Sequence, residues 1–238
     1  MKKLSSYIAK IDQPKILDIA TGAGNFITLL TTLTDDYTEI IGIDKEKSAI
    51  DMARQNFDDN RIHFKQMHGD HLEFSPNTFD IVCFSNSLHH VSDIYKIFNQ
   101  VHTVLNPRGY FIVAEMVSDR LTDAQKSHKQ LHHFAAKIDR LCHIIHEETY
   151  TRKEIKDMVL SYPKFTLVDD WILRYSRKKS NSDEEIGWLL KTIDRLLQKI
   201  PHETEETDAL IKEAESIKTY IERHGFDTCP TKVMVLKR

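Results

Sequence analysis

The sequence predicts an α/β fold in which helices cover both faces of a mostly parallel β-sheet. Short apolar runs, typical of buried strands, recur through the first half of the chain and alternate with segments of helical periodicity. A turn rich in small residues follows the first of these runs. A chain of 238 residues is the natural size of one such domain with additions, so we treat residues 1–238 as a single domain.

The composition gives the chain no marked affinity for polyanions. Hydrophobic residues make up 40% of the chain and charged residues 29%, which is enough apolar material for a sizeable core. The net charge of −3 provides no general attraction for nucleic acid or an anionic membrane, and we expect Arg177-Lys178-Lys179 to be a solvated loop. No apolar run reaches the length of a membrane span, and we expect no signal sequence because the N-terminus lacks an apolar h-region.

Cysteine usage points to a reducing compartment. Cys83, Cys142 and Cys229 lie far apart and form no disulfide or metal-binding pattern. Cys83 stands within an apolar run and is expected in the core. These features together predict a cytoplasmic protein.

The first strand and the turn after it are the centre of the prediction. A short helix within residues 1–11 precedes an apolar run at 16–20. The run ends at Thr21-Gly22-Ala23-Gly24, where small residues let the backbone turn tightly and let a ligand approach it. Asn25 then opens a helix at 26–33, whose first N–H groups would point into the turn, ready for a polar or anionic ligand.

Two cofactor families use a strand, a glycine-containing turn and a helix in this order. Dinucleotide enzymes need a third glycine, and Ile27 occupies that position here. Residues 17–24, Leu-Asp-Ile-Ala-Thr-Gly-Ala-Gly, instead resemble the first motif of class I S-adenosylmethionine-dependent methyltransferases. The resemblance implies a Rossmann-like sheet of seven strands with the last one antiparallel, S-adenosylmethionine as cofactor, and cofactor contacts from Asp18, Ala20, Thr21, Gly22, Gly24 and Asn25.

A carboxylate ends the second predicted strand, residues 39–44. Asp44 comes 20 residues after Gly24, where doubly wound sheets place an acid that accepts ribose hydroxyls. The resemblance gives Asp44 this role, with Lys45 beside it. The alternative is that Asp44 caps the following helix, residues 45–56.

The third strand, residues 61–67, leads into His68-Gly69-Asp70-His71. The resemblance implies that Asp70 and its neighbour His71 contact the adenine of the cofactor. The alternative is an ordinary turn aspartate with no ligand.

The fourth strand, residues 79–84, runs into Ser85-Asn86-Ser87-Leu88-His89-His90. This stretch is similar to the fourth motif of small-molecule methyltransferases of ubiquinone and menaquinone biosynthesis. The resemblance implies that Ser85 and Asn86 face the cofactor or the substrate. The Asp/Asn-Pro-Pro-aromatic motif of nucleic-acid amino-methyltransferases is absent, so a flipped base is not the expected substrate.

A helix at 93–105 and a fifth strand ending at Glu115 complete the region of resemblance, which covers residues 15–115. Arg108 replaces the first glycine of the family's turn before that strand. The next segment, residues 117–160, is expected to be helical and to lie over the active site. Its long helix, predicted at 122–145, has one apolar face and a second stripe of His128, His132, Asp139, His143 and His146.

Three interpretations of this polar stripe stay open. It can be a half-buried helix edge whose histidines bond to their neighbours. It can be a wall of the substrate pocket that carries a general base. The pairs His128/His132 and Asp139/His143 have the spacing that chelates zinc or iron, which is the third interpretation. No metal ligand is assigned from the sequence.

The C-terminal part predicts a helical insertion between the last two strands. Thr151 and Glu154 form a capping-box pattern that opens a helix to residue 160. Strands are expected at 165–175 and 232–236, with residues 180–226 between them as a hairpin of helices at 184–200 and 207–224, separated by Pro201. This insertion is expected to serve as a lid or an oligomer surface, the latter in a homodimer.

The predicted activity is methyl transfer from S-adenosylmethionine to a small, partly apolar molecule, with an oxygen, nitrogen, carbon or sulfur acceptor. A general base is needed for a protonated nucleophile, and the candidates are His89, His90 and His132, in falling order. The alternatives are a non-catalytic cofactor-binding protein that regulates a partner, and a protein methyltransferase. A nicotinamide dehydrogenase is disfavoured by the missing third glycine.

Overall fold

The computed structural model describes residues 1–174, 182–200 and 206–238. Its centre is a seven-stranded sheet of order β3-β2-β1-β4-β5-β7-β6, in which β7 runs antiparallel to its neighbours and the other strands are parallel to one another. The strands are β1 Lys15–Ile19, β2 Glu39–Asp44, β3 Ile62–Gln66, β4 Phe79–Ser85, β5 Leu105–Met116, β6 Thr166–Leu173 and β7 Thr231–Lys237. The predicted fold class is confirmed.

Helices cover both faces of the sheet because the central strands β1, β4 and β5 are largely apolar and buried on both sides. On one face lie α1 Lys2–Ile8, α2 Asn25–Leu33 and α3 Lys47–Asn56. On the other lie α4 Ile94–Val104 and α6 Arg152–Leu160. The capping box predicted at Thr151 is present at the start of α6. Two apolar cores, one on each side of the sheet, result from this arrangement.

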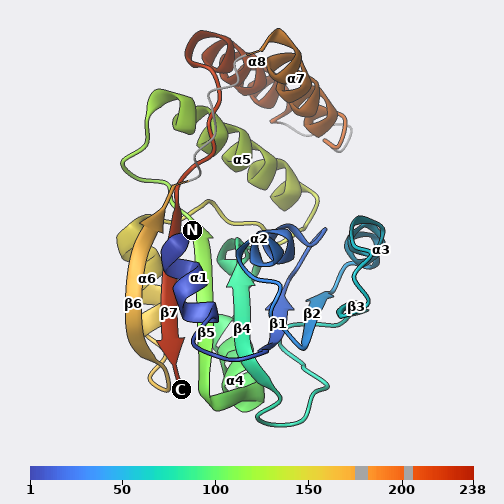
Figure 1. Cartoon of the computed structure of the whole chain (residues 1–238). Helices are drawn as coiled ribbons and strands as arrows, with labels where there is room; N and C mark the ends of the chain where they lie inside the picture. Colours follow the sequence, from blue (N-terminus) through green and yellow to red (C-terminus); the bar gives the residue numbers. More distant parts are fainter. Residues whose placement is uncertain (175–181, 201–205) are drawn as a thin grey trace.

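Three further helices form a third apolar core away from the sheet. They are α5 Asp123–Leu141, α7 Asp183–Leu197 and α8 Thr207–His224, and we call them the three-helix unit. Phe134, Ile193 and Ile217 lie buried at its centre. Figure 1 shows this unit beyond the carboxyl ends of β1 and β4, with α5 nearest to the sheet. The predicted helical hairpin therefore packs on α5.

The helix α5 is shorter than the sequence predicts, and the expected helix to residue 145 is wrong. The chain leaves the helix at Cys142, and His143 adopts the left-handed conformation with φ 59°. The N–H of Ile144 donates back to the carbonyl of Asp139 at 2.9 Å, which closes the helix end. His143 and His146 therefore lie in a loop, residues 142–150, and the single stripe of five polar residues does not exist.

Asp44 is not the cap of the following helix. The helix α3 begins at Lys47 with Glu46 at its N-cap, and the Asp44 carboxylate accepts a bond from the Glu46 N–H at 2.9 Å. The alternative prediction for Asp44 is wrong for this reason, and its side chain is left facing the carboxyl edge of the sheet.

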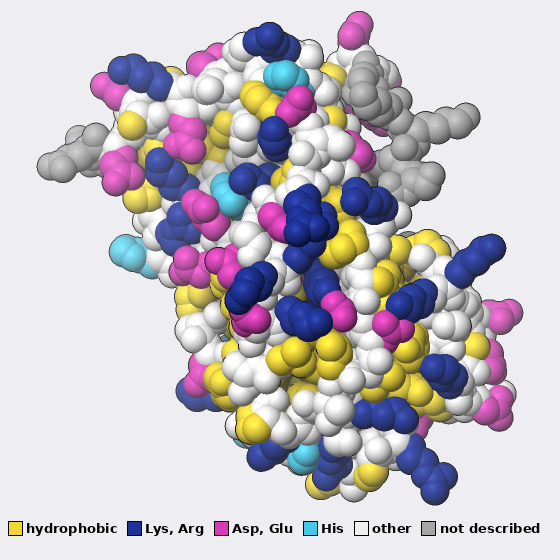
Figure 2. Space-filling view, turned by 90° about the vertical axis from the view of Figure 1, so that its left-hand side faces the viewer, with side chains coloured by type: hydrophobic (Ala, Val, Ile, Leu, Met, Phe, Trp, Pro, Cys, Tyr) yellow, Lys and Arg dark blue, Asp and Glu magenta, His cyan; other side chains and the backbone are white. Residues whose placement is uncertain are grey.

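Positive charge on the surface at the β6 edge of the sheet is interrupted by acidic side chains. Figure 2 shows Lys and Arg side chains gathered over the middle of this face with acidic ones among them. Asp170 of β6 pairs with Lys156 and Lys232, and Asp169 pairs with Lys3 at 2.8 Å. The basic stretch at 177–179 and Pro201 lie outside the described residues.

The cysteines are free, and Cys83 is buried in the core as predicted. Within the described ranges, no helix combines the length and apolar character that crossing a membrane requires.

Candidate functional site

A cleft of about 810 Å³ opens at the carboxyl ends of β1, β2 and β4. Its volume lies in the range of small-molecule sites, roughly 300–1,000 Å³. Ten of the twelve predicted cofactor residues line it: Asp18, Ala20, Thr21, Gly22, Asn25, Asp44, Lys45, Asp70, Ser85 and Asn86. The parallel strands bring these residues together because they end at the same edge of the sheet. Gly24 and His71 are not among the lining residues.

Gly24 serves packing at the start of α2. Its φ of 87° suits glycine, and a Cβ added there would lie 2.5 Å from Cε2 of Phe57. Its N–H donates to the carbonyl of Thr21 at 2.9 Å. The missing side chain at this position thus lets Phe57, which follows α3, approach the turn, and this is a different reason for glycine than contact with a ligand.

Asp44 ties the glycine turn to the second strand. Its carboxylate accepts bonds from the N–H groups of Gly22 and Glu46, both at 2.9 Å. The amide of Gly22 is therefore already occupied by a carboxylate of the chain itself. A turn that holds an aspartate in this way is poorly suited to bind the pyrophosphate of a dinucleotide, since both would compete for the same N–H.

Asp18 is a buried carboxyl group at the floor of the cleft. The Thr21 hydroxyl donates to its Oδ2 at 2.6 Å, while Oδ1 is buried and has no partner among the described residues. Burial raises the pKa of Asp18 to about 7; the bond from Thr21 opposes this rise, and the charge of Asp44 adds to it. The unpaired oxygen can accept a bond from a ligand donor in the cleft.

The cleft carries more acidic than basic groups. Its lining includes Asp18, Asp44, Glu46, Asp70 and Asp93, against the two lysines Lys45 and Lys96. A surplus of carboxylates in a concave site favours a cationic ligand and disfavours an anionic one.

The far end of the cleft includes four apolar residues to which the sequence did not point. Val91 and Ile97 contribute from the region after β4, and Ile144 and Ile145 contribute from the loop 142–150. Ile144 is 50% exposed and Ile145 is 45% exposed, so both present apolar surface next to the cleft. They were predicted to lie on a helix, and no glycine or proline in the sequence marks the loop that places them here.

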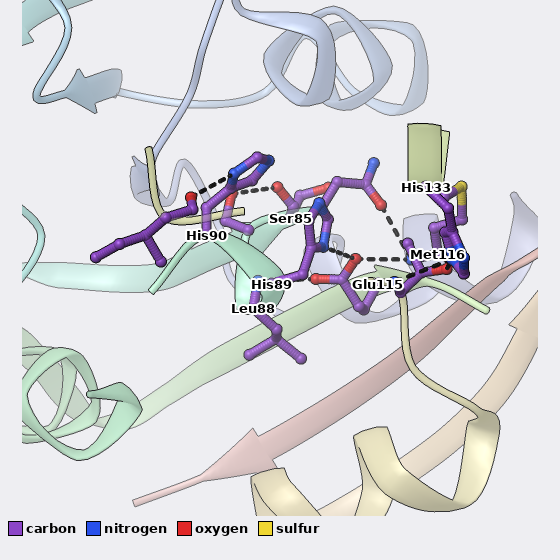
Figure 3. Close-up of polar contacts among 11 residues, drawn as sticks. Ser85, Leu88, His89, His90, Glu115, Met116 and His133 are labelled. Atoms are coloured by element: carbon purple, nitrogen blue, oxygen red, sulfur yellow. Dashed lines mark hydrogen bonds and ion pairs between the residues drawn. The ribbon is translucent and has the colours of Figure 1, made fainter. Parts of the chain in front are cut away.

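Of the three predicted bases, His90 is the one that lines the cleft. Its Nδ1 lies 3.4 Å from the carbonyl oxygen of Ile145 (Figure 3). Burial, together with the neighbouring rings of His89 and His146, lowers the pKa of His90 to about 4. The ring is therefore neutral near pH 7 and can accept a hydrogen bond.

His89 and His132 lie behind His90, away from the cleft lining. His89 is buried, and its Nδ1 lies 3.0 Å from Oε1 of Glu115. Figure 3 shows the Glu115 carboxylate placed between the His89 ring and the backbone N–H groups of Leu88 and Met116, which donate to it at 2.8 and 3.0 Å. The role of these two histidines as bases stays a prediction.

The residues that build the cleft match a known family of domains. The family model described as "Methyltransferase domain" matches residues 12–159, which include every element that lines the cleft. The chain belongs to this methyltransferase domain family. Its membership confirms the family that the motifs indicated and, with it, the enzyme class and the cofactor, S-adenosylmethionine. The helices α7 and α8 lie outside the matched residues.

The curated relatives resemble part of the methyltransferase domain. A ubiquinone/menaquinone biosynthesis C-methyltransferase from Haemophilus ducreyi is 30% identical over 105 residues, which are 42% of this chain and 40% of that enzyme. A demethylmenaquinone methyltransferase from Thermotoga maritima is 24% identical over 116 residues, 49% of each chain. The matched segment thus spans less than half the length of these relatives.

A solved structure supports the fold. An S-adenosylmethionine-dependent methyltransferase from Thiobacillus denitrificans, crystallised with S-adenosyl-L-homocysteine, aligns with a TM-score of 0.56 at 15% identity. The alignment covers 100% of this chain and 90% of that one. At this identity the likeness shows the fold alone, and it extends over the three-helix unit.

Proposed function

We propose that this methyltransferase domain transfers the methyl group of S-adenosylmethionine to a small, partly apolar molecule bound at the His90 end of the cleft. Two observations at the cleft carry the proposal: a carboxylate already binds the amide of the glycine turn, and the lining has a surplus of negative charge. Asp44 holds the Gly22 amide, and carboxylates outnumber lysines in the cleft. A sulfonium cofactor suits this site, whereas a pyrophosphate does not.

The cofactor is proposed to lie along the ends of β1, β2 and β4. The Asp44 carboxylate would accept the ribose hydroxyls with the lone pairs that Gly22 and Glu46 leave free. The unpaired Oδ1 of Asp18 would accept a bond from the ammonium group of the methionine moiety. Asp70 would contact the adenine, at the edge of the cleft after β3.

The acceptor is proposed to contact His90 and the apolar residues Val91, Ile144 and Ile145. Half-exposed isoleucines beside a cleft favour a ligand with apolar surface, as in the substrates that the names of the curated relatives indicate. Bound S-adenosylmethionine would supply a methyl group on a sulfonium, whose sulfur–carbon bond would break as the bond to the nucleophile forms, with S-adenosylhomocysteine as the leaving group. The neutral His90 ring accepts the proton of the nucleophile and passes it to solvent.

Calorimetric titration with S-adenosylmethionine, S-adenosylhomocysteine and NAD tests the cofactor. We expect the first two to bind and Asp44→Ala to weaken both at least tenfold, about 1.4 kcal/mol, because the ribose acceptor is lost. Asp51→Ala, which removes an exposed carboxylate of α3, is the matched control and should bind as the unaltered protein does. Binding of NAD alone would overturn the proposal.

Substitution of His90 tests the acceptor end of the cleft. With a methyl acceptor found by screening phenols, enols and thiols, His90→Ala should lower kcat by roughly 10²-fold while cofactor affinity stays unchanged. His63→Ala alters an exposed histidine of β3 outside the cleft lining and serves as control. An unchanged kcat in His90→Ala would reject the role of His90, and absence of transfer to any acceptor would favour the non-catalytic alternative.

A cytoplasmic location and a homodimer formed through the hairpin stay predictions from the sequence. Light scattering in solution measures the molecular mass and so tests the homodimer.

A further inference from the structure

Three histidine rings meet behind the cleft from segments that are far apart in the sequence. His89 follows β4, in the 3-10 helix Leu88–His90; His132 lies on α5; and His146 lies in the loop 142–150. One ring nitrogen of each lies within 4.8 Å of the others. The ring centroids of His89 and His132 are 4.9 Å apart, as are those of His132 and His146. The methyl transfer proposed above assigns no step to this histidine cluster.

Glu115 fixes the orientation of the first ring. Its carboxylate accepts bonds from two backbone N–H groups, and its Oε1 lies 3.0 Å from Nδ1 of His89. A carboxylate there holds the proton on Nδ1 and leaves the lone pair on Nε2. The Nε2 of His89 is therefore the atom available to a ligand.

Asp139 fixes the orientation of the His146 ring in the same way. Its Oδ2 lies 2.8 Å from Nδ1 of His146, which leaves the lone pair on Nε2. The side chain of His146 is 7% exposed, and its Nε2 is buried without a partner among the described residues. The Arg140 guanidinium donates to the carbonyl of His146 at 2.7 Å, so the backbone of this residue is held as well.

His132 completes the set with a further buried nitrogen. Its Nδ1 has no partner among the described residues. Two unpaired buried polar atoms therefore lie in this cluster, and a buried polar atom without a hydrogen-bond partner is unfavourable.

We propose that His89, His132 and His146 bind one divalent transition metal ion of the zinc class. Neutral imidazoles are the ligands that such ions prefer, and a carboxylate on the second ring nitrogen is the usual outer partner of a metal-bound histidine. Nitrogens bound to zinc at about 2.0–2.1 Å lie about 3.3 Å apart in a tetrahedral site, so ring movements on the order of 1 Å would close the cluster on the ion.

The ion would fix the wall of the acceptor end of the cleft. It joins the end of β4, helix α5 and the loop that carries Ile144 and Ile145. His90, which lines the cleft, has its ring centroid 4.3 Å from that of His89 and 4.1 Å from that of His146. His90 therefore lies between the proposed metal site and the proposed position of the acceptor.

Metal binding can be measured without any activity assay. The full chain, freed of any affinity tag and treated with a chelator, is titrated with Zn²⁺ against a chromophoric chelator and with Co²⁺ by absorption in the visible range. We expect one ion per chain and the strong d–d absorption of low-coordinate Co²⁺. His146→Ala and His132→Gln should each abolish stoichiometric binding, while His143→Asn, which alters an exposed histidine of the same loop, should retain it.

Substitution of Asp139, whose carboxylate contacts the Nδ1 of His146, provides a second test. Asp139→Asn should weaken the binding of Zn²⁺ by about 10–100-fold without abolishing it, because the ligands remain but the His146 ring loses its orienting charge. Circular dichroism of each variant verifies that it is folded. Absence of stoichiometric metal in the unaltered protein, or equal binding by folded His132→Gln, would overturn the proposal. Calorimetry with S-adenosylmethionine on the same samples reports the cofactor site separately.

Discussion

A single buried carboxyl group in the cleft lacks the hydrogen-bond partners that a buried polar group in a stable core normally has. Asp18 is 1% exposed, and one of its oxygens has no partner among the described residues. A buried acid of this kind is protonated more readily in the folded chain than in the unfolded one, since burial disfavours its charge. The folded protein therefore bears a cost at neutral pH that a bound cation would offset.

This cost predicts a pH dependence of stability for Asp18→Asn. The pKa of Asp18 rises from 3.8 to about 7 on folding, so the contribution of this group to stability is full below the lower value and is lost as the pH rises through the higher one. The loss is on the order of 4 kcal/mol at about 1.36 kcal/mol per pKa unit. An asparagine at this position has no charge to bury, so the variant should gain stability over the unaltered protein across this pH range.

Urea denaturation of both proteins at pH 5, 6, 7 and 8 measures this difference. The difference in free energy of unfolding should grow with pH and level off above the folded-state pKa of Asp18, which is about 7. Thr21→Val, which removes the hydroxyl that donates to Asp18, is a useful comparison, because it should lower stability most at high pH. Parallel pH profiles for Asp18→Asn and the unaltered protein would contradict the prediction.

At the scale of elements, the end of α5 decides which residues reach the cleft. The helix stops because His143 takes a left-handed conformation, and the following loop is held by several bonds. The N–H of Glu147 donates to the carbonyl of His89 at 2.7 Å, and the N–H of Ser118 donates to the carbonyl of Tyr150 at 2.9 Å. These contacts with distant segments outweigh the helical periodicity of the local sequence.

Glycine at position 143 should therefore stabilise the protein. A left-handed residue with a Cβ carries a cost of about 1–2 kcal/mol that glycine avoids, partly offset by the greater freedom of glycine in the unfolded chain. We expect His143→Gly to raise the free energy of unfolding by about 0.5–1 kcal/mol. His143→Val should lower it, since a β-branched residue tolerates this conformation poorly. Chemical denaturation measures both, and the same sign for the two variants would refute the explanation.

At the scale of the whole molecule, the described residues form three apolar cores, two on the sheet and one in the three-helix unit. The third is built from α5, α7 and α8 without any strand. The sheet faces share the buried strands β1, β4 and β5, whereas the third core shares no residue with them. The three-helix unit should therefore open on its own at a lower free energy than the sheet.

Hydrogen exchange on Ile193→Ala tests this separation. Ile193 is fully buried in the three-helix unit, and its truncation to alanine should cost about 2–5 kcal/mol there. Amides of α7 and α8 should lose protection while those of β1 and β4 keep theirs. The matched variant Ile112→Ala, in the sheet, should lower the protection of the sheet amides and leave the exchange of α7 and α8 through their own opening largely unchanged. Equal loss of protection in the sheet for Ile193→Ala would show that the cores unfold together.

The sequence by itself determined the sheet and most of the residues that line the cleft. Apolar runs ending in Thr21, Asp44 or Ser85 are local signals, and parallel strands bring their carboxyl ends to one edge whatever the details of packing. The family resemblance covered the same local stretches. For these reasons ten predicted cofactor residues line one cleft, while Gly24, whose role is packing, does not.

Tertiary structure decided the far end of the cleft and the histidine cluster. The residues His89, His132 and His146 come from three segments, and no spacing in the sequence relates His89 to the other two. Helical periodicity placed His143 and His146 on one face of a helix, but the helix ends before them. Contacts with the segments that follow β4 and β5, at His89 and Ser118, hold the loop in place. Such contacts depend on packing between distant segments, which periodicity in one segment cannot encode.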